Sequence, residues 1–510
     1  MLNNANISSL FEFALREHSA IPVFERTNGQ LISREALVAH ATAMAGALLR
    51  AGVRPGDRIT VQAEKSTALV ALYLAALKIG AVYHPLNTAY TPSEAAYFLA
   101  DAEPAVVVAP AAKLTLIEPS ARRAGARALL SLEDDGSGSL ADAAAAAAPM
   151  YETVRRGADD LAALLYTSGT TGRSKGAMIT HGNLATNAAA LIKIWGLARG
   201  ETLIHALPIY HVHGLFVALN TALLGGLKMI WQDKFDATAV LARLPDAHIF
   251  MGVPTFYSRI LAEPGLTPAA CKQMRLFVSG SAPLLAETHQ AFLLRTRHTI
   301  LERYGMTETG MIASNPLHGE RIAGTVGYPL PDVAIRTTDN AGKEQPRGAT
   351  GMVEVKGPNV FAGYWRMPDK TREDIRPDGF FITGDQGVLA DDGRLTLVGR
   401  AKDLIITGGL NVYPREIEQA LDGMPGIAES AVFAVPHIDF GEAVAAAVVM
   451  KSGGIQLPSE AEMIATLSKT LAKFKCPKRI VVLTELPRNS MGKVSKAELR
   501  ARFKTLLDGS

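Results

Sequence analysis

Residues 166–176 read Tyr-Thr-Ser-Gly-Thr-Thr-Gly-Arg-Ser-Lys-Gly and combine three glycines, five serine or threonine hydroxyls and two cations. Glycine lets the backbone approach a ligand closely, and successive N–H groups in such a turn form a concave anion-binding site. The hydroxyls and the charges of Arg173 and Lys175 add donors for phosphate oxygens. This composition predicts a loop that binds a polyphosphate.

The spacing of this loop differs from that of a Walker A sequence, in which Gly-Lys-Ser or Gly-Lys-Thr closes the loop. Here Arg173, Ser174 and Lys175 follow Gly172, so a P-loop NTPase is disfavoured. A flexible surface linker is the other explanation of a Gly/Ser-rich stretch. Linkers rarely follow a buried-strand pattern such as the apolar run at 161–165, which favours the phosphate loop.

Length and charge limit the classes of protein to consider. The chain has 510 residues, more than one hydrophobic core usually holds, so we expect at least two domains. Its 52 Lys and Arg against 49 Asp and Glu give a net charge of +3, without a basic block. Nucleic acid and anionic membranes are therefore not expected partners. The sequence is silent on the oligomeric state.

The cysteines and the apolar runs bear on the compartment. Cys271 and Cys476 lie far apart without metal-ligand spacing, which argues against a disulfide framework and a zinc site. The first 20 residues lack the apolar region of a signal peptide. The most apolar internal run, 68–82, contains Lys78 and is too short to span a bilayer. We expect a cytoplasmic protein.

Short apolar runs alternate with helical patterns through the first two-thirds of the chain. The pattern predicts a helix at 36–50 and strands at 58–62 and 105–109. From about residue 351 it changes to strands with turn signals, at 352–356 and 391–397. We expect an α/β fold with a large N-terminal domain of layered α/β subdomains plus a β-rich element.

A compact α/β pattern follows the Gly399-Arg400 pair and is long enough for a small domain. Helices are predicted at 414–421 and 459–471. Strands are predicted at 431–435, 443–450 and 480–483. The chain should therefore end in a small C-terminal α/β domain.

Seven motifs in order carry a resemblance to a known family. They occupy residues 167–176, 207–211, 279–283, 303–309, 381–385, 399–403 and 486–493. With them, nearly the whole chain resembles the adenylate-forming superfamily of acyl-CoA synthetases, luciferases and peptide-synthetase adenylation domains. In that family a carboxylate attacks the α-phosphorus of ATP to form an acyl-adenylate, and a thiol then displaces AMP. The resemblance implies ATP, Mg²⁺ and coenzyme A.

Most of these motifs are assigned to the nucleotide by the resemblance. Thr307 would contact a phosphate oxygen, and Glu308 would bind Mg²⁺, a hard cation that suits one carboxylate with phosphates and waters. Asp385 would accept both ribose hydroxyls, with Arg400 beside the same sugar. The nucleotide-binding residues so implied are Thr167, Ser168, Gly169, Thr170, Thr171, Gly172, Lys175, Ser281, Ala282, Pro283, Arg303, Tyr304, Gly305, Met306, Thr307, Asp385, Arg400 and Lys493.

Tyr304 and the turn at 281–283 would flank the adenine ring. Lys493 lies in a loop marked by Pro, Gly and Asn, where a lysine by itself would simply be solvated. In the family this mobile loop places its lysine between the carboxylate and the α-phosphate. The catalytic residues implied are Lys493, Thr307, Glu308 and His211.

The resemblance also implies that the small domain moves. It would rotate about Lys402 and bring Gly408 and Gly409 to line the pantetheine tunnel, so that one site serves two half-reactions. The implied organisation is an AMP-binding domain at 1–399, a hinge at 400–403 and a mobile domain at 404–510.

The acyl substrate is indicated by Arg259, the His211-Val212-His213 sequence and Glu302 before Arg303, which look like the malonyl-CoA synthetase branch. An acid with a second carboxylate needs a cation, and arginine holds it with two parallel hydrogen bonds. Alternatively, the Arg259 side chain extends from its helix to solvent. The residues predicted to contact the acid are Arg259, Ser279, Ser281, His211, Val212 and Met306.

His211 should position the acyl carboxylate rather than bind a metal, because two histidines two residues apart without acidic partners make a poor metal site. His213 is assigned a structural role. Val212 and Met306 would limit the α-substituent, which leaves methylmalonate as a second substrate.

The sequence therefore predicts an ATP-dependent, AMP-forming synthetase of malonyl-CoA. The first alternative is a synthetase for another short or medium carboxylic acid. The second is a stand-alone adenylation enzyme that loads a carrier-protein pantetheine, and the third a catalytically silent nucleotide-binding scaffold. Lys493, Glu308 and Asp385 together argue against the scaffold.

Overall fold

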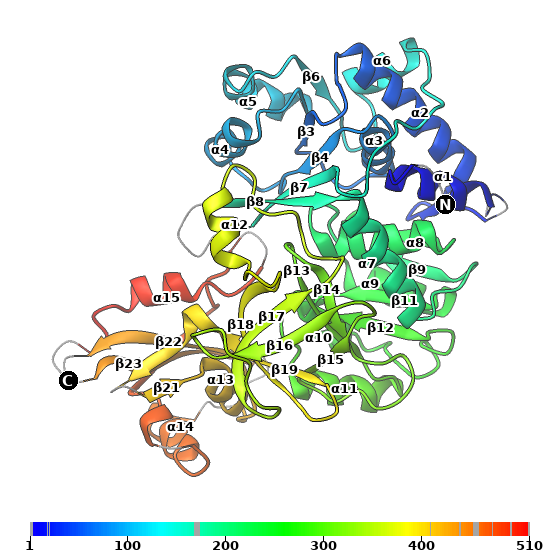
Figure 1. Ribbon diagram of the computed structural model, residues 1–510. Helices are drawn as coiled ribbons and strands as arrows, with labels where there is room; N and C mark the ends of the chain where they lie inside the picture. Colours follow the sequence, from blue (N-terminus) through cyan, green and yellow to red (C-terminus); the bar gives the residue numbers. More distant parts are fainter. Residues whose placement is uncertain are drawn as a thin grey trace. The chain divides into compact units, whose positions relative to one another are not determined.

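The computed structural model describes residues 4–17, 19, 21–167, 174–407, 410–437, 440–451, 458–471, 473–489 and 492–507 (Figure 1). Two compact units make up the chain. Unit 1 consists of Met1–Leu284, Thr288–Ala334 and Val355–Phe381, and unit 2 of Leu285–Glu287, Ile335–Glu354 and Ile382–Ser510. The hinge at 400–403 remains a prediction.

One sheet of unit 1 has the strand order β6-β5-β3-β4-β7-β8, parallel except for the β7–β8 hairpin. Its central strands are buried apolar runs, as expected of a parallel sheet covered by helices, whereas the edge strand β6 is half-buried. The strands are β3 (Arg58–Val61), β4 (Val82–Pro85), β5 (Val106–Ala109), β6 (Ala128–Ser131), β7 (Leu161–Thr167) and β8 (Lys175–Thr180). The helices between them are α3 (Thr67–Lys78), α4 (Pro92–Ala102), α5 (Ala111–Arg123) and α6 (Ser139–Ala146), and α2 (Arg34–Arg50) precedes β3.

The second sheet of unit 1 runs β15-β14-β13-β12-β11-β9-β10-β1-β2. Neighbours from β13 to β1 are parallel, whereas β14, β15 and β2 join antiparallel. The strands are β1 (Phe24–Arg26), β2 (Leu31–Ile32), β9 (Thr202–His205), β10 (Lys228–Trp231), β11 (Ile249–Gly252), β12 (Leu276–Ser279), β13 (Leu301–Met306), β14 (Gly310–Ser314) and β15 (Thr325–Pro329). The carboxyl ends of its parallel strands share one edge, where open α/β sheets bind ligands.

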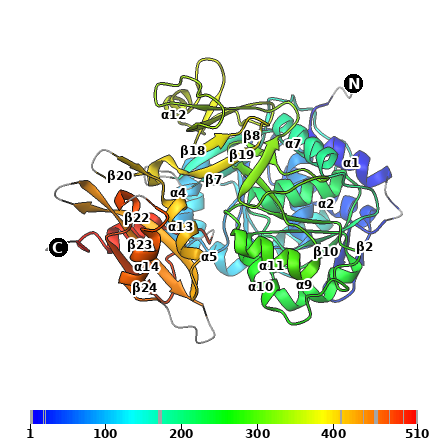
Figure 2. The ribbon, with the colours of Figure 1, turned by 90° about the horizontal axis from the view of Figure 1, so that it is seen from below.

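Helices α9 (Ala237–Arg243), α10 (Pro254–Ala262) and α11 (Ala286–Thr296) lie together beside this sheet (Figure 1, Figure 2). They pack through one buried cluster in which Tyr257, Phe277 and Phe292 meet edge to face. Elsewhere in unit 1 lie α1 (Ile7–Glu17), α7 (His181–Ile194), the π-helix η1 (His213–Leu219), α8 (Asn220–Leu224), the 3₁₀ turn η2 (Leu244–Asp246) and α12 (Pro368–Asp374).

Unit 2 contains the predicted β-rich element, as β16 (Ala334–Thr338), β17 (Thr350–Lys356), β18 (Phe381–Leu389) and β19 (Leu395–Arg400) in that order. Its other sheet runs β21-β20-β23-β22, with β24 on β23. These strands are β20 (Ile405–Thr407), β21 (Leu410–Val412), β22 (Ile427–His437), β23 (Gly441–Met450) and β24 (Arg479–Leu483). The helical segments are η3 (Ala401–Asp403), α13 (Pro414–Asp422), α14 (Glu460–Leu467), η4 (Lys473–Lys475) and α15 (Lys496–Arg502).

The α/β class and the predicted elements are confirmed, but several boundaries are wrong. Strand β22 spans Ile427–His437 rather than 431–435, and β19 begins at Leu395 rather than at residue 391 because residues 391–393 form the turn before it. Helix α14 ends at Leu467 rather than at residue 471. Beyond it, the amide of Lys469 donates to the carbonyl of Thr466, a tighter turn that closes the helix without a Gly or Pro signal. In the ranges that the structure describes, no helix combines the length and apolarity needed to cross a membrane.

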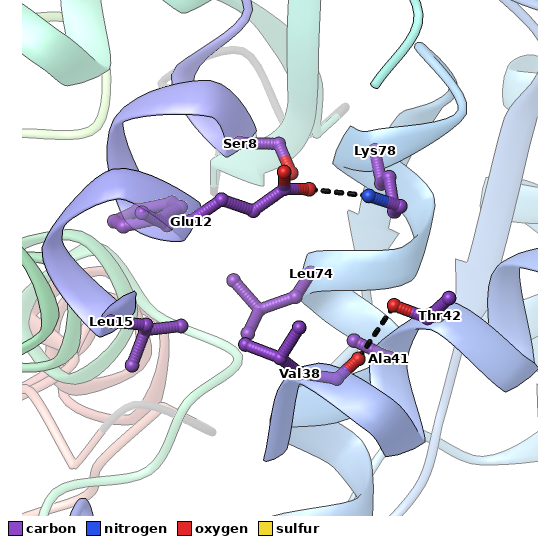
Figure 3. A pocket seen from close by; sticks show the side chains of 9 residues that line it. Ser8, Glu12, Leu15, Val38, Ala41, Thr42, Leu74 and Lys78 are labelled. Atoms are coloured by element: carbon purple, nitrogen blue, oxygen red, sulfur yellow. Dashed lines mark hydrogen bonds and ion pairs between the residues drawn. The ribbon is translucent and has the colours of Figure 1, made fainter. Parts of the chain in front are cut away.

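The N-terminal helix α1 is held to α3 by an ion pair between buried Lys78 and half-buried Glu12. Lys78 Nζ lies 2.5 Å from Glu12 Oε1, and the two side chains meet above the apolar Leu74 (Figure 3). Lys78 also donates to the Tyr151 carbonyl at 2.8 Å, and Thr153 Oγ1 donates to Glu12 at 2.7 Å. The Lys78 side chain is only 4% exposed, so its charge depends on these partners.

We expect Lys78→Met to lower the free energy of unfolding by about 3 kcal/mol, because it leaves the Glu12 carboxylate without its cation. The double variant Lys78→Met with Glu12→Leu should recover most of this loss. Urea unfolding followed by circular dichroism measures both. A single variant within about 0.5 kcal/mol of wild type would contradict this role for the ion pair.

Candidate active site

The first cluster of predicted site residues forms at the turn between β13 and β14. Glu308 in this turn is 4% exposed, and its Oε1 accepts hydrogen bonds from Thr167 Oγ1 at 3.3 Å and Tyr364 Oη at 3.1 Å. Thr167 ends β7, and Tyr364 precedes α12, so three distant segments converge on one carboxylate. The structure thus brings the first motif and the Thr307-Glu308 motif together.

Lys175, at the start of β8, extends this cluster. Its Nζ lies 4.2 Å from the centre of the Tyr364 ring and 3.7 Å from Asp374 Oδ2. Burial, and then the charges of Glu308 and Asp374, raise the pKa of the Tyr364 phenol above its usual range. The phenol therefore remains a hydrogen-bond donor to Glu308 at neutral pH. Sequence reasoning missed Tyr364 and Asp374, which carry no motif signal of their own.

The second cluster centres on Arg303, within β13. Its side chain is 4% exposed, yet Nε and Nη2 have no hydrogen-bond partner in the described part of the chain. Burial lowers the pKa of the guanidinium to about 9. Gly280 accommodates it, since a methyl group there would lie 2.3 Å from Arg303 Cζ. The protein holds a cation here whose free donors suit an anion.

Polar side chains from the end of β12 and from η1 lie around this part of β13, and His213 is near enough to Arg303 to feel its charge. Ser279 ends β12 and is buried, and its hydroxyl has no partner among the described residues. Ser281 has a left-handed φ of 71° and lies with its Oγ 3.3 Å from His213 Nδ1. Burial, and then the charge of Arg303, hold the pKa of His213 well below its usual range. The His213 imidazole is therefore neutral in this cluster. The sequence did not reveal its contact with Ser281.

The π-helix η1 explains how the histidine motif is presented. A methyl group on Gly214 would lie 2.0 Å from the Pro208 carbonyl oxygen, so the preceding loop packs directly against the helix. His205 Nε2 lies 2.9 Å from the Gly214 carbonyl oxygen and braces the same turn. As a result Val212 and His213 are buried, whereas His211 is partly exposed. Single π-helical turns are frequent at functional sites.

The other predicted acyl and adenine residues of unit 1 differ in exposure. Arg259 lies on the exposed side of α10 and makes no ion pair with the described part of the chain, while Tyr257 faces the core. Tyr304 is buried, and Gly305, Met306 and Thr307 are partly exposed. Ala282 and Pro283 are exposed beside Ser281.

In unit 2, the structure brings Asp385 and Arg400 together. They are cross-strand partners on β18 and β19, and Arg400 Nε lies 2.6 Å from Asp385 Oδ1. The amide of Asp385 donates to Thr383 Oγ1 at 3.1 Å, and that hydroxyl donates to the Val353 carbonyl at 2.8 Å. The carboxylate is buried and fixed in orientation, as a group that binds two hydroxyls requires.

Lys402 and Lys493 are both exposed. The loop that carries Lys493 is closed by Asn489, whose amide N–H donates to the Lys493 carbonyl at 2.8 Å and whose Oδ1 accepts from the Lys493 amide at 3.0 Å. The predicted site residues outside the described residues are Ser168, Gly169, Thr170, Thr171, Gly172, Gly408 and Gly409.

Comparison with known proteins identifies the family. A family model described as AMP-binding enzyme matches residues 11–365, and one described as AMP-binding enzyme C-terminal domain matches residues 416–493. The chain belongs to the AMP-binding enzyme family. The predicted membership is therefore confirmed.

Several proteins resemble this AMP-binding enzyme along nearly its whole length. A feruloyl-CoA synthase from Amycolatopsis sp is 35% identical over 483 residues, covering 94% of this chain and 95% of its own. A mitochondrial malonate–CoA ligase from Xenopus laevis is 34% identical over 490 residues, covering 88% and 83%. The solved structure of ATP-bound MatB from Rhodopseudomonas palustris is 52% identical with a TM-score of 0.94, covering 99% of both chains. The resemblance to the malonyl-CoA synthetase branch is confirmed.

The side chains of this AMP-binding enzyme fit Mg²⁺ only if the nucleotide and water supply the remaining ligands. Within the described residues, no three His, Cys, Asp or Glu side chains group to hold a metal ion. Glu308 is a single oriented carboxylate, and Mg²⁺ is commonly held by one carboxylate together with substrate phosphates and waters. Glu308 therefore fits Mg²⁺ that arrives with a nucleotide.

We expect Gly280→Ala to lower the free energy of unfolding by about 2 kcal/mol, because the added methyl must displace the Arg303 guanidinium. Urea unfolding measures the change. Gly157→Ala is the matched control, since its methyl would meet its nearest atom at 3.6 Å. Equal stability of the two variants would show that Gly280 is not required by Arg303.

Proposed function

We propose that the chain is an AMP-forming acid–thiol ligase that converts malonate, ATP and CoA to malonyl-CoA, AMP and diphosphate through malonyl-adenylate. The AMP-binding family matches and the similarity to malonate–CoA ligase and MatB support this reaction. The observation that carries the choice of acid is the buried guanidinium of Arg303.

Malonate has two carboxylates with different tasks. One attacks the α-phosphorus of ATP, and the other remains an anion that needs a cation in the pocket. Arg303 offers Nε and Nη2 with no partner from the described residues, two donors of a planar fork that binds carboxylate with parallel hydrogen bonds. Neutral His213, which contacts Ser281, provides a polar atom near it.

Arg303, rather than Arg259, is proposed to bind the second carboxylate of malonate. From the sequence alone, Arg303 is expected to contact the nucleotide instead. Arg259 lies on the exposed side of its helix, whereas Arg303 is buried without a counter-ion in the described chain. A bound monocarboxylate has no second carboxylate and would leave the Arg303 charge uncompensated. A buried charge without its partner costs about 3–5 kcal/mol. A feruloyl or acetyl substrate is disfavoured for the same reason.

Val212 and Met306 are proposed to limit the α-substituent, with methylmalonate as the second substrate.

For the nucleotide, we propose that Thr307 and Lys175 contact phosphate oxygens and that Asp385 and Arg400 bind the ribose. Mg²⁺ bound at Glu308 would supply charge neutralisation on the phosphates. Thr167 and Tyr364 fix the rotamer of Glu308, because both donate to the same Oε1. His211 is proposed to position the reacting carboxylate.

Lys493 is proposed to stabilise the charge that develops between the carboxylate and the α-phosphate. The small domain is then proposed to turn about Lys402, so that the segment with Gly408 and Gly409 lines the path of CoA. Lys493 acts in the first half-reaction only, which makes its role separable by experiment.

The test of the acid is CoA-dependent AMP release with malonate, methylmalonate, acetate, octanoate and ferulate. We expect malonate to exceed acetate in kcat/KM by a few hundredfold, about 3 kcal/mol in transition-state binding. Arg303→Met should remove most of this preference and leave the acetate value nearly unchanged. Arg259→Ala should keep the preference within about threefold, since its side chain is exposed.

If Arg259→Ala lost the preference for malonate over acetate while Arg303→Met kept it, Arg259 would be the residue that binds the second carboxylate, as the sequence predicts. A wild-type preference for acetate, octanoate or ferulate would remove malonate from the proposal. A purified acyl carrier protein with its pantetheine, used in place of CoA, separates the carrier-loading alternative.

Lys493→Ala should slow adenylate formation by about 100-fold, because it removes a cation aimed at the transition state. Conversion of supplied malonyl-adenylate and CoA to the thioester should stay within about threefold of wild type. Malonate-dependent exchange of pyrophosphate into ATP measures the first step. Equal losses in both steps would contradict the assignment.

A further inference from the structure

The turn with Thr307 and Glu308 lacks a strand partner on one side. Strand β14 pairs with β15 only through Ala313 and Ser314, so the backbone of Met311 has no β15 neighbour. Buried backbone groups need hydrogen-bond partners, and here a side chain supplies them. Asn187 Oδ1 accepts from the Met311 amide at 3.0 Å, and its Nδ2 donates to the Met311 carbonyl at 2.9 Å.

Asn187, on helix α7, therefore takes the place of a neighbouring strand. A methyl group on Gly310 would lie 2.7 Å from Asn187 Oδ1, and Gly310 has a left-handed φ of 56°. The amide side chain thus lies directly against the first residue of β14, where the turn ends. Asn187 is 9% exposed, so water replaces these bonds poorly.

A second asparagine, in the segment before α12, also binds the turn. Asn359 Nδ2 donates to the Thr309 carbonyl at 2.8 Å and to the Met311 carbonyl at 3.1 Å. Two residues on, the Phe361 amide donates to the Glu308 carbonyl at 2.8 Å. Glu308 is therefore held at its backbone as well as at its carboxylate.

The two asparagines are linked through Asn183. This residue lies one helical turn before Asn187 on α7, and its Nδ2 donates to the carbonyls of Pro358 and Val360 at 2.8 and 2.9 Å. Helix α7 thus binds the turn directly and also binds the segment that holds it. The contacts form one network around a single turn.

We propose that Asn187 and Asn359 are positioning residues for adenylation, which hold the turn at 307–309 so that Glu308 and Thr307 face the nucleotide phosphates. The proposal rests on the proposed function, in which these two residues act on the phosphates. Displacing a reacting group by about 1 Å can slow a reaction by about 100-fold.

The test is single-turnover formation of malonyl-adenylate by rapid quench, with enzyme in excess over malonate. For Asn187→Ala and Asn359→Ala we expect the rate constant to fall by about 30-fold while the fraction of active enzyme stays near that of wild type. Asn187→Asp should be slower still, because its carboxylate would face the Met311 carbonyl. A merely structural role would lower the amplitude and leave the rate constant unchanged.

Asn6→Ala is the matched control. Asn6 is also fully buried and donates to two backbone carbonyls, of Leu77 and Val154, at 2.7 and 3.0 Å. It supports α1 and contacts none of the turn residues. Its variant should lose stability comparably and keep the wild-type rate constant.

Glu308→Gln provides a second readout. If Asn187 acts through Glu308, adding Asn187→Ala to Glu308→Gln should slow adenylation by less than about threefold more. The positioning role would be overturned if the effects of the two substitutions on the adenylation rate were fully additive in free energy. An Asn187→Ala rate constant within about twofold of wild type would overturn it as well. Absence of malonyl-adenylate with the wild-type enzyme would instead overturn the proposed function.

Discussion

The buried charge of Arg303 is the constraint on which the proposed acyl site depends. Its neighbours accommodate it: Gly280 leaves room for the guanidinium, and His213 stays neutral near it. Taking a cation out of water costs several kcal/mol unless an anion compensates it. A pocket built around this charge favours an acid that keeps a negative group after its first carboxylate has reacted.

Strand β13 connects the proposed acyl site to the residues proposed to act on the phosphates. On one side it is parallel to β12, whose end supplies Ser279, and on the other it turns back into β14. The antiparallel return places Glu308 in a hairpin turn rather than at the start of a helix. Such a turn has no helix dipole or long ladder to hold it, so side chains from α7 and from the segment before α12 support it.

The sequence predicted the fold class and the elements, because these follow from local periodicity, and its motifs named the residues of the proposed phosphate site. It did not reveal Tyr364 or Asp374 beside Lys175, since these contacts join residues almost 200 positions apart. It also chose Arg259 over Arg303 for the second carboxylate. We propose Arg303 instead because it is buried, and burial of a single charged residue inside a strand leaves no periodic signal.

The malonyl-adenylate intermediate can be tested by following oxygen from malonate that carries ¹⁸O in both carboxylates, incubated with ATP, CoA and the wild-type enzyme. Attack of a carboxylate oxygen on the α-phosphorus transfers that oxygen to AMP when CoA displaces it. We predict that mass spectrometry finds one ¹⁸O in each AMP formed with malonyl-CoA. Label in inorganic phosphate together with ADP, or unlabelled AMP, would contradict a malonyl-adenylate intermediate.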